Sequence, residues 1–175
     1  MIARRQPARP APPIPMTLPD EKAPALQAQA VFDTLCGYWR FDRRIPGQAA
    51  MQGHARFDWY ADGALLYRET GLLRLENGRT CHAYRSYVYR RLPDGFSVWF
   101  DEPQPRLFHE VRLAQDGDAW SGRAMHPCGA DRYDTVYTFR PDGSFVIRHD
   151  VVGPRKDYVS TTAFHRDPGN DDAQA

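Results

Sequence analysis

The sequence has little of several features that mark common protein classes. It has three cysteines, Cys36, Cys81 and Cys128, and an odd number at wide spacing does not suit a disulfide framework. It has no run of about 18 apolar residues, so no membrane-spanning segment is predicted. The N-terminus carries arginines but no apolar stretch and therefore does not resemble a secretory signal, so we expect a cytoplasmic protein.

The sequence also lacks an excess of either charge. Lysine and arginine total 23 and aspartate and glutamate total 22, which argues against nucleic acid or an anionic membrane as an obligatory partner. Arginine greatly outnumbers lysine and is the better partner for carboxylates. Aromatic residues make up 13% of the chain, which favours β-structure and a ligand pocket.

The length of 175 residues fits one domain between two tails. Residues 1–24 are rich in proline and are predicted to be a disordered tail, as is the acidic end at 168–175. The domain is expected to span residues 25–167. Its only predicted helix covers residues 25–36 and ends at Gly37, which would serve as the residue after the C-cap.

From Gly37 onward apolar and polar residues alternate with a period of two, which predicts strands. The predicted strands are 38–46, 51–60, 64–75, 80–91, 95–101, 106–114, 118–126, 131–140, 144–152 and 157–166. Between them lie five Asp-Gly or Asn-Gly turn signals, at Asp62-Gly63, Asn77-Gly78, Asp94-Gly95, Asp116-Gly117 and Asp142-Gly143. This pattern favours an all-β fold, a single antiparallel up-and-down barrel of about ten strands with one N-terminal helix. A two-sheet sandwich is the alternative.

The alternation also predicts which charges face the barrel interior. Arg43 shares a face with Trp39, Glu69 with Tyr67, and Arg85 with Tyr87, whereas the opposite faces carry solvated arginines. Buried charges are costly unless they are paired. Glu69 therefore either pairs with one or both arginines in a satisfied network, or leaves one arginine to bind an anionic group of a ligand.

Several short motifs together resemble a known family. They are Leu35-x-Gly37-x-Trp39-x-Phe41-x-Arg43, Leu66-Tyr67-x-Glu69-x-Gly71, Tyr84-Arg85-x-Tyr87, Phe108-His109, His126-x-Cys128-x-x-Asp131-x-Tyr133 and Gly153-Pro154-Arg155-Lys156-Asp157-Tyr158. Over about residues 33–166 the chain resembles a lipocalin-like (calycin-type) family of bacterial and fungal proteins known only as a domain of unknown function. The resemblance implies the barrel and carries no established activity.

The segment from His126 to Tyr133 gathers an imidazole, the Cys128 thiol, the Asp131 carboxylate and a phenol. A zinc site would need a second cluster of ligands, which the sequence lacks, so no metal and no cofactor are expected. A thiol nucleophile with a histidine base, a loop held by hydrogen bonds and a ligand contact at the barrel mouth all remain open.

His109 is either a packed histidine or an acid–base group. His149 and His165 raise the alternative of haem bound through one histidine, although a charged interior counts against it. Arg155 and Lys156 lie in a predicted turn and form either a solvated ion-pair turn or a cationic rim that attracts anions.

These observations predict that the barrel binds a small, partly apolar, carboxylate-bearing molecule in its lumen. The alternatives are a cofactor-independent isomerase, cyclase or decarboxylase of an aromatic or unsaturated acid, haem binding, or a packed interaction domain. An enzyme would use Glu69, His109 or His126 as its proton-transfer groups. The predicted ligand-binding residues are Trp39, Arg43, Tyr67, Glu69, Arg85, Tyr87, His109, His126, Asp131, Tyr133, Arg155 and Lys156. The sequence leaves the oligomeric state open.

Overall fold

The structure is a computed structural model that describes residues 22–168. Helix α1 (Lys22–Asp33) is followed by ten strands and a short 3₁₀ segment, η1 (Ala61–Gly63). The strands are β1 (Gly37–Ile45), β2 (Ala49–Trp59), β3 (Leu65–Leu75), β4 (Thr80–Leu92), β5 (Gly95–Phe100), β6 (Leu107–Asp116), β7 (Ala119–Cys128), β8 (Asp131–Phe139), β9 (Phe145–Gly153) and β10 (Lys156–Arg166). Every predicted strand is present, with each end within two residues of its predicted position.

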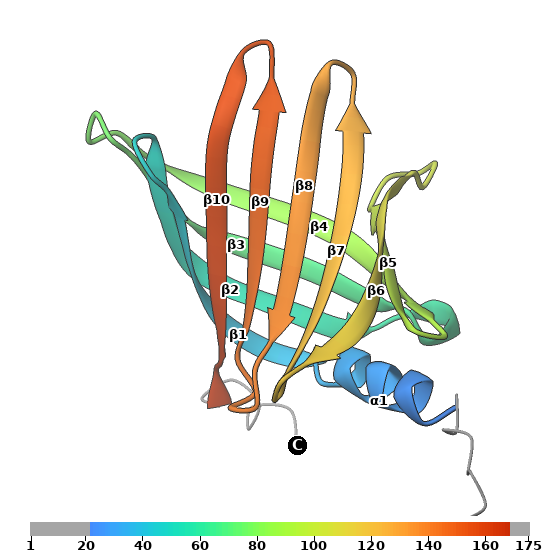
Figure 1. The fold of residues 1–175 in the computed structure, drawn as a ribbon. Helices are drawn as coiled ribbons and strands as arrows, with labels where there is room; N and C mark the ends of the chain where they lie inside the picture. The colour runs from blue at the N-terminus through green and yellow to red at the C-terminus, as the bar shows by residue number, and fades with distance from the viewer. Residues whose placement is uncertain (1–21, 169–175) are drawn as a thin grey trace, which may run out of the picture.

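The ten strands form one closed barrel in which each strand pairs antiparallel with its neighbours in sequence. The barrel closes where β1 pairs with β10, with Phe41 opposite Phe164 and Trp39 opposite Arg166. Figure 1 shows β7 to β10 in front, while β1 to β4 cross behind them at a steep angle. The prediction of an antiparallel up-and-down barrel with one N-terminal helix is therefore confirmed, and the sandwich alternative is wrong.

The predicted end of the helix is wrong. The helix stops at Asp33, and residues 34–36 turn the chain into β1, so Gly37 is the first strand residue. Gly37 has a φ of 119°, which a residue with a side chain rarely adopts. Of the predicted tails, residues 1–21 and 169–175 lie outside the described residues, and the helix begins at Lys22, inside the predicted N-terminal tail.

All five predicted hairpin turns connect neighbouring antiparallel strands, and at four of them the glycine, Gly63, Gly78, Gly117 or Gly143, has a positive φ. Gly95 does not. It is needed for a different reason, because a Cβ there would lie 2.0 Å from the carbonyl oxygen of Val111. The sheet therefore passes too close to this position for any side chain.

A second close approach occurs between β2 and β3. Gly53 lies opposite Gly71, and a Cβ on Gly53 would lie 2.1 Å from the carbonyl oxygen of Thr70. Glycines at such positions allow strands to bend sharply, as closure of a barrel requires. The Gly53–Gly71 pair is therefore part of what closes this barrel.

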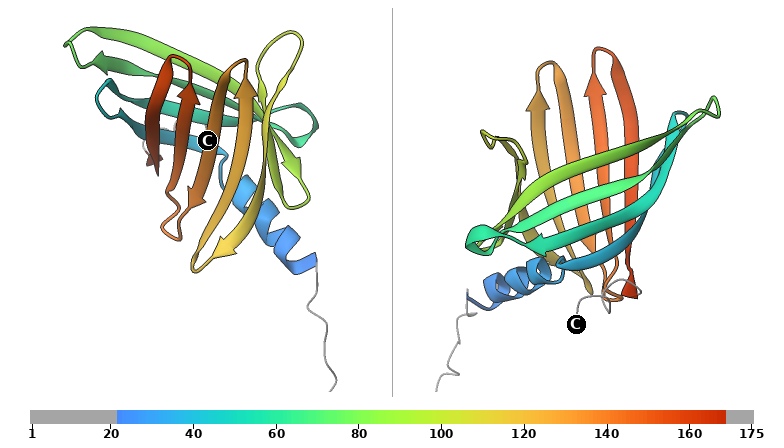
Figure 2. Two further views of the ribbon diagram at one scale, coloured as in Figure 1. Left: turned by 45° about the horizontal axis from the view of Figure 1, so that its top comes forward. Right: turned by 180° about the vertical axis from the view of Figure 1, so that it is seen from behind.

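Helix α1 covers one end of the barrel, which we call the closed end (Figure 2). Phe32 of the helix is fully buried and lies 6.1 Å, between ring centroids, from Phe96 of β5. Trp39 is buried beside them, and its indole Nε1 donates a hydrogen bond to the carbonyl of Leu35 at 2.8 Å. The guanidinium of Arg166 covers the indole ring at 4.1 Å. These contacts fasten the helix and the last strand to the start of β1.

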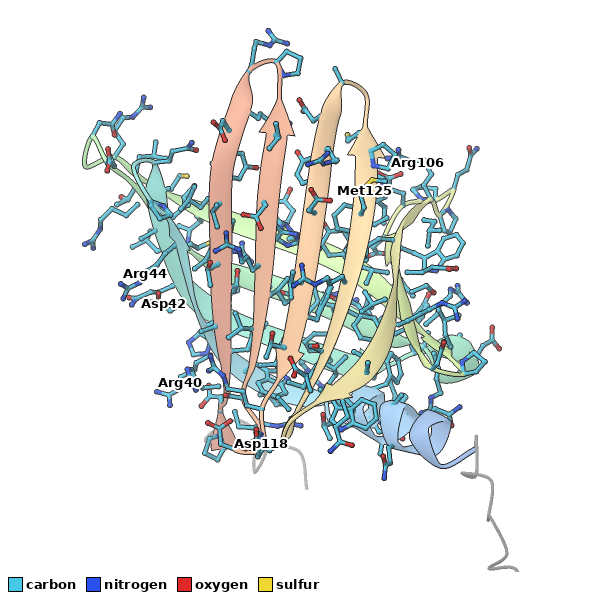
Figure 3. All side chains as sticks on the ribbon, viewed as in Figure 1. Arg40, Asp42, Arg44, Arg106, Asp118 and Met125 are labelled. Carbon is cyan, nitrogen blue, oxygen red and sulfur yellow. The ribbon has the colours of Figure 1, made fainter. Side chains whose placement is uncertain are left out.

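The outer surface carries the charges that the alternation assigned to it. Arg40, Asp42 and Arg44 of β1 point away from the barrel (Figure 3). Asp42 accepts hydrogen bonds from Arg44 at 3.1 Å and from Gln52 at 2.8 Å. Among the described residues, no helix is both long enough and apolar enough to cross a membrane.

Candidate functional site

The barrel interior changes in character from the closed end towards the hairpins at the opposite end. Along β3 the inward residues are Leu65, then Tyr67, then Glu69. On β8, read from its C-terminal end, the inward residues are Phe139, Tyr137, Thr135 and Tyr133. Hydrocarbon thus fills the closed end, hydroxyl and charged groups form a middle layer, and polar aromatic groups lie nearest the opposite end.

Beyond the middle layer the lumen is open. A cavity of about 390 Å³ occupies the half of the barrel away from α1. Its charged lining is Arg43, Glu69 and Arg85. Its aromatic and imidazole lining is Tyr84, Tyr87, Phe100, Phe108, His126, Tyr133, His149 and Tyr158. The volume lies at the lower end of the range of small-molecule pockets.

Arg43 and Glu69 form the floor of this cavity. The two outer guanidinium nitrogens of Arg43 each donate to one carboxylate oxygen of Glu69, both at 2.7 Å, and Arg43 Nε donates to Thr162 Oγ1 at 2.8 Å. The hydroxyl of Tyr67 also donates to Glu69. Burial alone would raise the pKa of Glu69, but the hydrogen bonds and charge of Arg43 outweigh it and hold that pKa below its ordinary value. Glu69 is therefore a carboxylate at neutral pH.

Arg85 makes a weaker contact with Glu69 than Arg43 does. Its Nε lies 3.8 Å from Glu69 Oε1, and 45% of its side chain is exposed. The guanidinium lies 5.9 Å from the ring centre of Tyr87. Since Arg43 already makes both short contacts with the carboxylate, the charge of Arg85 is only partly compensated. Its planar donor group faces the cavity.

A layer of buried hydroxyl groups lies beneath the floor. Tyr89 and Tyr137 are hydrogen-bonded to each other, and the Tyr137 hydroxyl lies 2.9 Å from His109 Nε2. Burial raises the pKa of each tyrosine, so both stay neutral. A separate void of about 20 Å³, large enough for one water, lies between this layer and the Arg43–Glu69 pair.

His109 lies outside the cavity lining because of an irregularity in β6. Val98 of β5 pairs with His109 and Trp99 pairs with Leu107, so Phe108 has no partner and forms a bulge. Phe108 lines the cavity, and its ring covers that of His109 at 4.3 Å. Burial lowers the pKa of His109 to about 3, and its Nδ1 makes no hydrogen bond to residues 22–168.

His149 is a cavity residue that the sequence indicated only as a haem alternative. It lies on β9, and its Nδ1 is 2.8 Å from the hydroxyl of Thr135, which is fully buried. Burial and then the charges of Arg85 and Arg43 lower the pKa of His149 to about 4. The ring is therefore neutral and is held in one orientation.

An aromatic wall adjoins the charged floor, since Tyr87 lies against Arg85. Phe108 stacks on Tyr87, with ring centroids 5.6 Å apart and planes at 7°, and Phe100 packs against both rings. His126 lies 4.7 Å from Phe108, and Tyr133 lies 6.4 Å from His126. A flat apolar ligand would find extensive contact with such a wall.

The structure brings together six of the predicted ligand-binding residues in the cavity lining. They are Arg43, Glu69, Arg85, Tyr87, His126 and Tyr133. Tyr67 lies just beneath and lines the small void. His109 is buried below the floor, and Trp39 belongs to the core of the closed end, so neither lines the cavity.

The remaining predicted residues lie near the ends of the hairpins. Lys156 forms an ion pair with Asp131 at 2.6 Å and donates a hydrogen bond to the hydroxyl of Tyr133 at 2.9 Å. Both contacts raise the pKa of the lysine. Arg155 is exposed at the tip of the β9–β10 hairpin. Lys156 therefore forms its ion pair with a neighbouring hairpin and not within its own turn. Asp131, Arg155 and Lys156 do not line the cavity.

Sequence reasoning missed several lining residues. Phe100 and Phe108 are adjacent to loops and to the bulge, where alternation no longer shows which side chains face inward. Tyr158 and Ser160 were recoverable, because they alternate with the buried Thr162 and Phe164 on β10. Among the described residues, no three His, Cys, Asp or Glu side chains are arranged to hold a metal ion.

Comparison with known families identifies the chain. Residues 35–166 match the profile of the family of unknown function DUF6314. The protein belongs to this family. The match covers all ten strands of the DUF6314 barrel and leaves out helix α1. No curated protein matches the chain.

Among solved structures, this chain is similar to two redesigned beta barrels and to EF1p2_mFAP2b. A redesigned beta barrel, b11L5F_LGL, has 13% identity and a TM-score of 0.37, over 77% of this chain and 93% of its own. The structure of EF1p2_mFAP2b bound to DFHBI has 11% identity and a TM-score of 0.40, over 80% of this chain and 99% of its own. A redesigned barrel, mFAP1, also bound to DFHBI, has 11% identity and a TM-score of 0.35, over 77% and 96%.

Proposed function

We propose that this protein binds a small, partly apolar carboxylate in the open half of its barrel, with Arg85 as the partner of the anionic group. The observation that carries the proposal is the unequal sharing of one carboxylate between two arginines. Arg43 holds both oxygens of Glu69 at 2.7 Å, while Arg85 reaches the same group only at 3.8 Å. A ligand carboxylate would supply the close partner that Arg85 lacks.

The rest of the lining fits the apolar part of such a ligand. The stacked rings of Tyr87 and Phe108 offer a flat surface, and Met51, Leu73 and Val151 add hydrocarbon on other strands. A cavity that combines an apolar wall with a few polar groups is typical of small-molecule sites. The cavity also argues against the alternative of an interior packed throughout.

The enzymatic alternative needs a cavity group that can take up and release a proton near neutral pH. Glu69 is held as a carboxylate by Arg43, and His109 is covered by Phe108. Of the three predicted acid–base candidates, only His126 lines the cavity without a hydrogen bond to residues 22–168. The geometry therefore supports binding better than proton transfer by a pair of groups.

A titration with matched probes tests the proposal. We expect the full chain to bind 2-naphthoate and to bind its uncharged amide, 2-naphthamide, at least about tenfold more weakly, because a charge-assisted hydrogen bond is lost. Arg85→Met should remove this preference. Arg90→Met, on the same strand but exposed on the outer face, should keep it. Equal affinity for acid and amide, or a preference that survives in Arg85→Met, would remove Arg85 from the site.

A further inference from the structure

The cavity contains a second polar group that the proposed function does not use. His149 lines both the cavity and the small void beside the Arg43–Glu69 pair, and Arg85 lines the same two spaces. The two side chains are therefore neighbours at the floor. Arg85 also exerts the largest charge effect on His149, which agrees with this placement.

Only one nitrogen of His149 remains for a ligand. Its Nδ1 is engaged by Thr135 Oγ1 at 2.8 Å, while its Nε2 makes no hydrogen bond to any described residue. Within residues 22–168, His109 Nδ1 is the only side-chain nitrogen or oxygen that is fully buried and has no hydrogen-bond partner. Since His149 Nε2 also has no partner, it is not fully buried and can be reached by a water-sized molecule. The fixed ring thus presents a single unpaired nitrogen beside the anion partner.

The hydrogen-bonding capacity of that nitrogen depends on the proton at Nδ1. If Thr135 donates to Nδ1, then Nε2 carries the proton and donates; if Nδ1 donates to Thr135, then Nε2 accepts. A hydroxyl group both donates and accepts, so it satisfies either form. A second carboxylate or an ammonium group would satisfy only one form, and an ammonium would also lie beside the charge of Arg85.

We infer that the ligand is a hydroxy acid, with a hydroxyl on the carbon adjacent to the one that bears the carboxylate, and that His149 determines selectivity for this hydroxyl. This inference rests on the proposed function, because it places the carboxylate on Arg85. The low pKa of His149 agrees with it, since an uncharged imidazole selects for hydrogen bonding and not for charge. His149 would thus be a specificity-determining residue.

The experiment compares three acids on the full chain by calorimetric titration. The acids are 2-naphthoate, 3-hydroxy-2-naphthoate, whose hydroxyl is adjacent to the carboxylate-bearing carbon, and 6-hydroxy-2-naphthoate, whose hydroxyl is remote. We expect the adjacent isomer to bind about five- to tenfold more tightly than 2-naphthoate, as one additional neutral hydrogen bond permits. The remote isomer should gain nothing. This comparison needs no variant.

Variants then assign the preference to one residue. His149→Phe should bind both acids with equal affinity, and His149→Gln, which keeps a neutral hydrogen-bonding group, should keep part of the preference. His82→Phe is the matched control, because His82 is an exposed histidine outside this cavity. Thermal unfolding of each variant shows that it is folded.

The outcomes separate the two proposals. If 2-naphthoate binds through Arg85 but the adjacent hydroxyl adds no affinity, the hydroxy-acid inference is wrong and the proposed function stands. A preference that persists in His149→Phe also overturns the inference. If 2-naphthoate does not bind the wild-type chain, the proposed function fails and the inference fails with it.

Discussion

Arg43 and Glu69 form a bidentate ion pair between two strands that are separated by a third strand. Arg43 lies on β1 and Glu69 on β3, and Met51 and Ala55 of β2 are their respective strand neighbours. The side chains of the pair are 11% and 2% exposed. A pair so deeply buried anchors the floor of the cavity, and its removal leaves a charge without a partner.

Glu69→Gln is therefore expected to destabilise the fold by about 3–5 kcal/mol, because the buried Arg43 guanidinium loses its counter-charge. Urea denaturation followed by tryptophan fluorescence measures the loss. Glu102→Gln is the control, since Glu102 makes a similar two-pronged contact with Arg106 at 3.0 Å on the surface. Water compensates for the loss of such an exposed pair, so its unfolding midpoint should hardly change. Similar losses in both variants would contradict the role given to burial.

Stability is expected to fall as the pH is lowered from about 6.5 towards 4. His109 and His149 have folded-state pKa values of about 3 and about 4, whereas unfolded histidine has a pKa of about 6.5. In this window the unfolded chain binds protons that the folded chain does not, so the free energy of unfolding decreases by up to about 1.4 kcal/mol per pH unit for each histidine. Denaturation curves at several pH values measure the slope.

The variant His149→Gln should have a shallower slope, because it removes one of the two contributions. His82→Gln, at an exposed position, should keep the wild-type slope. A free energy of unfolding that stays constant between about pH 6.5 and 5 would show that the two imidazoles are protonated in the folded barrel.

Gly53→Ala is expected to destabilise the barrel by at least about 2 kcal/mol. The new Cβ would lie 2.1 Å from the Thr70 carbonyl oxygen, and a backbone atom can move away only if the strand pair shifts. Ala50→Ser, at an exposed position of the same strand, should change stability by less than about 0.5 kcal/mol. Thermal or urea unfolding decides the case, and equal stability of the two variants would show that β2 and β3 are not held together at this point.

Arg166→Ala is expected to lower stability by about 2 kcal/mol and the melting temperature by about 5 °C. Arg166 donates to the carbonyl of Cys36 at 2.6 Å and to that of Thr34, and it covers the indole of Trp39. Its loss separates the last strand from the turn that follows the helix. Arg112→Ala, which removes an exposed arginine bonded to Asp94, should melt near the wild-type temperature. Differential scanning calorimetry of both variants provides the test.

The sequence predicted the ten strands well because alternation and turn residues are local signals. It also assigned the inward faces of β1, β3, β4 and β8 correctly, since successive side chains of a strand point to opposite sides. The prediction was less successful at Phe108, where the bulge turns two successive side chains inward. A bulge has no reliable signal in the sequence of one chain.

The alternation of residues along a strand does not show how deep within the barrel an inward side chain lies. Trp39 and Arg43 share one inward face, yet one is sealed at the closed end and the other forms the floor of the cavity. Lys156 and Asp131, predicted as ligand contacts, bond each other across two hairpins. Strand tilt and stagger set these heights, and they follow from the closure of all ten strands together.

The amino-acid sequence by itself therefore determined the strands, their order and, away from the bulge at Phe108, the side of the barrel wall on which residues lie, because these follow from the chemistry of neighbouring residues. Only the tertiary structure decided which arginine Glu69 holds, which histidines line the cavity and where the lumen is filled. Those outcomes depend on distances between residues far apart in the chain, which exist only once the barrel has closed.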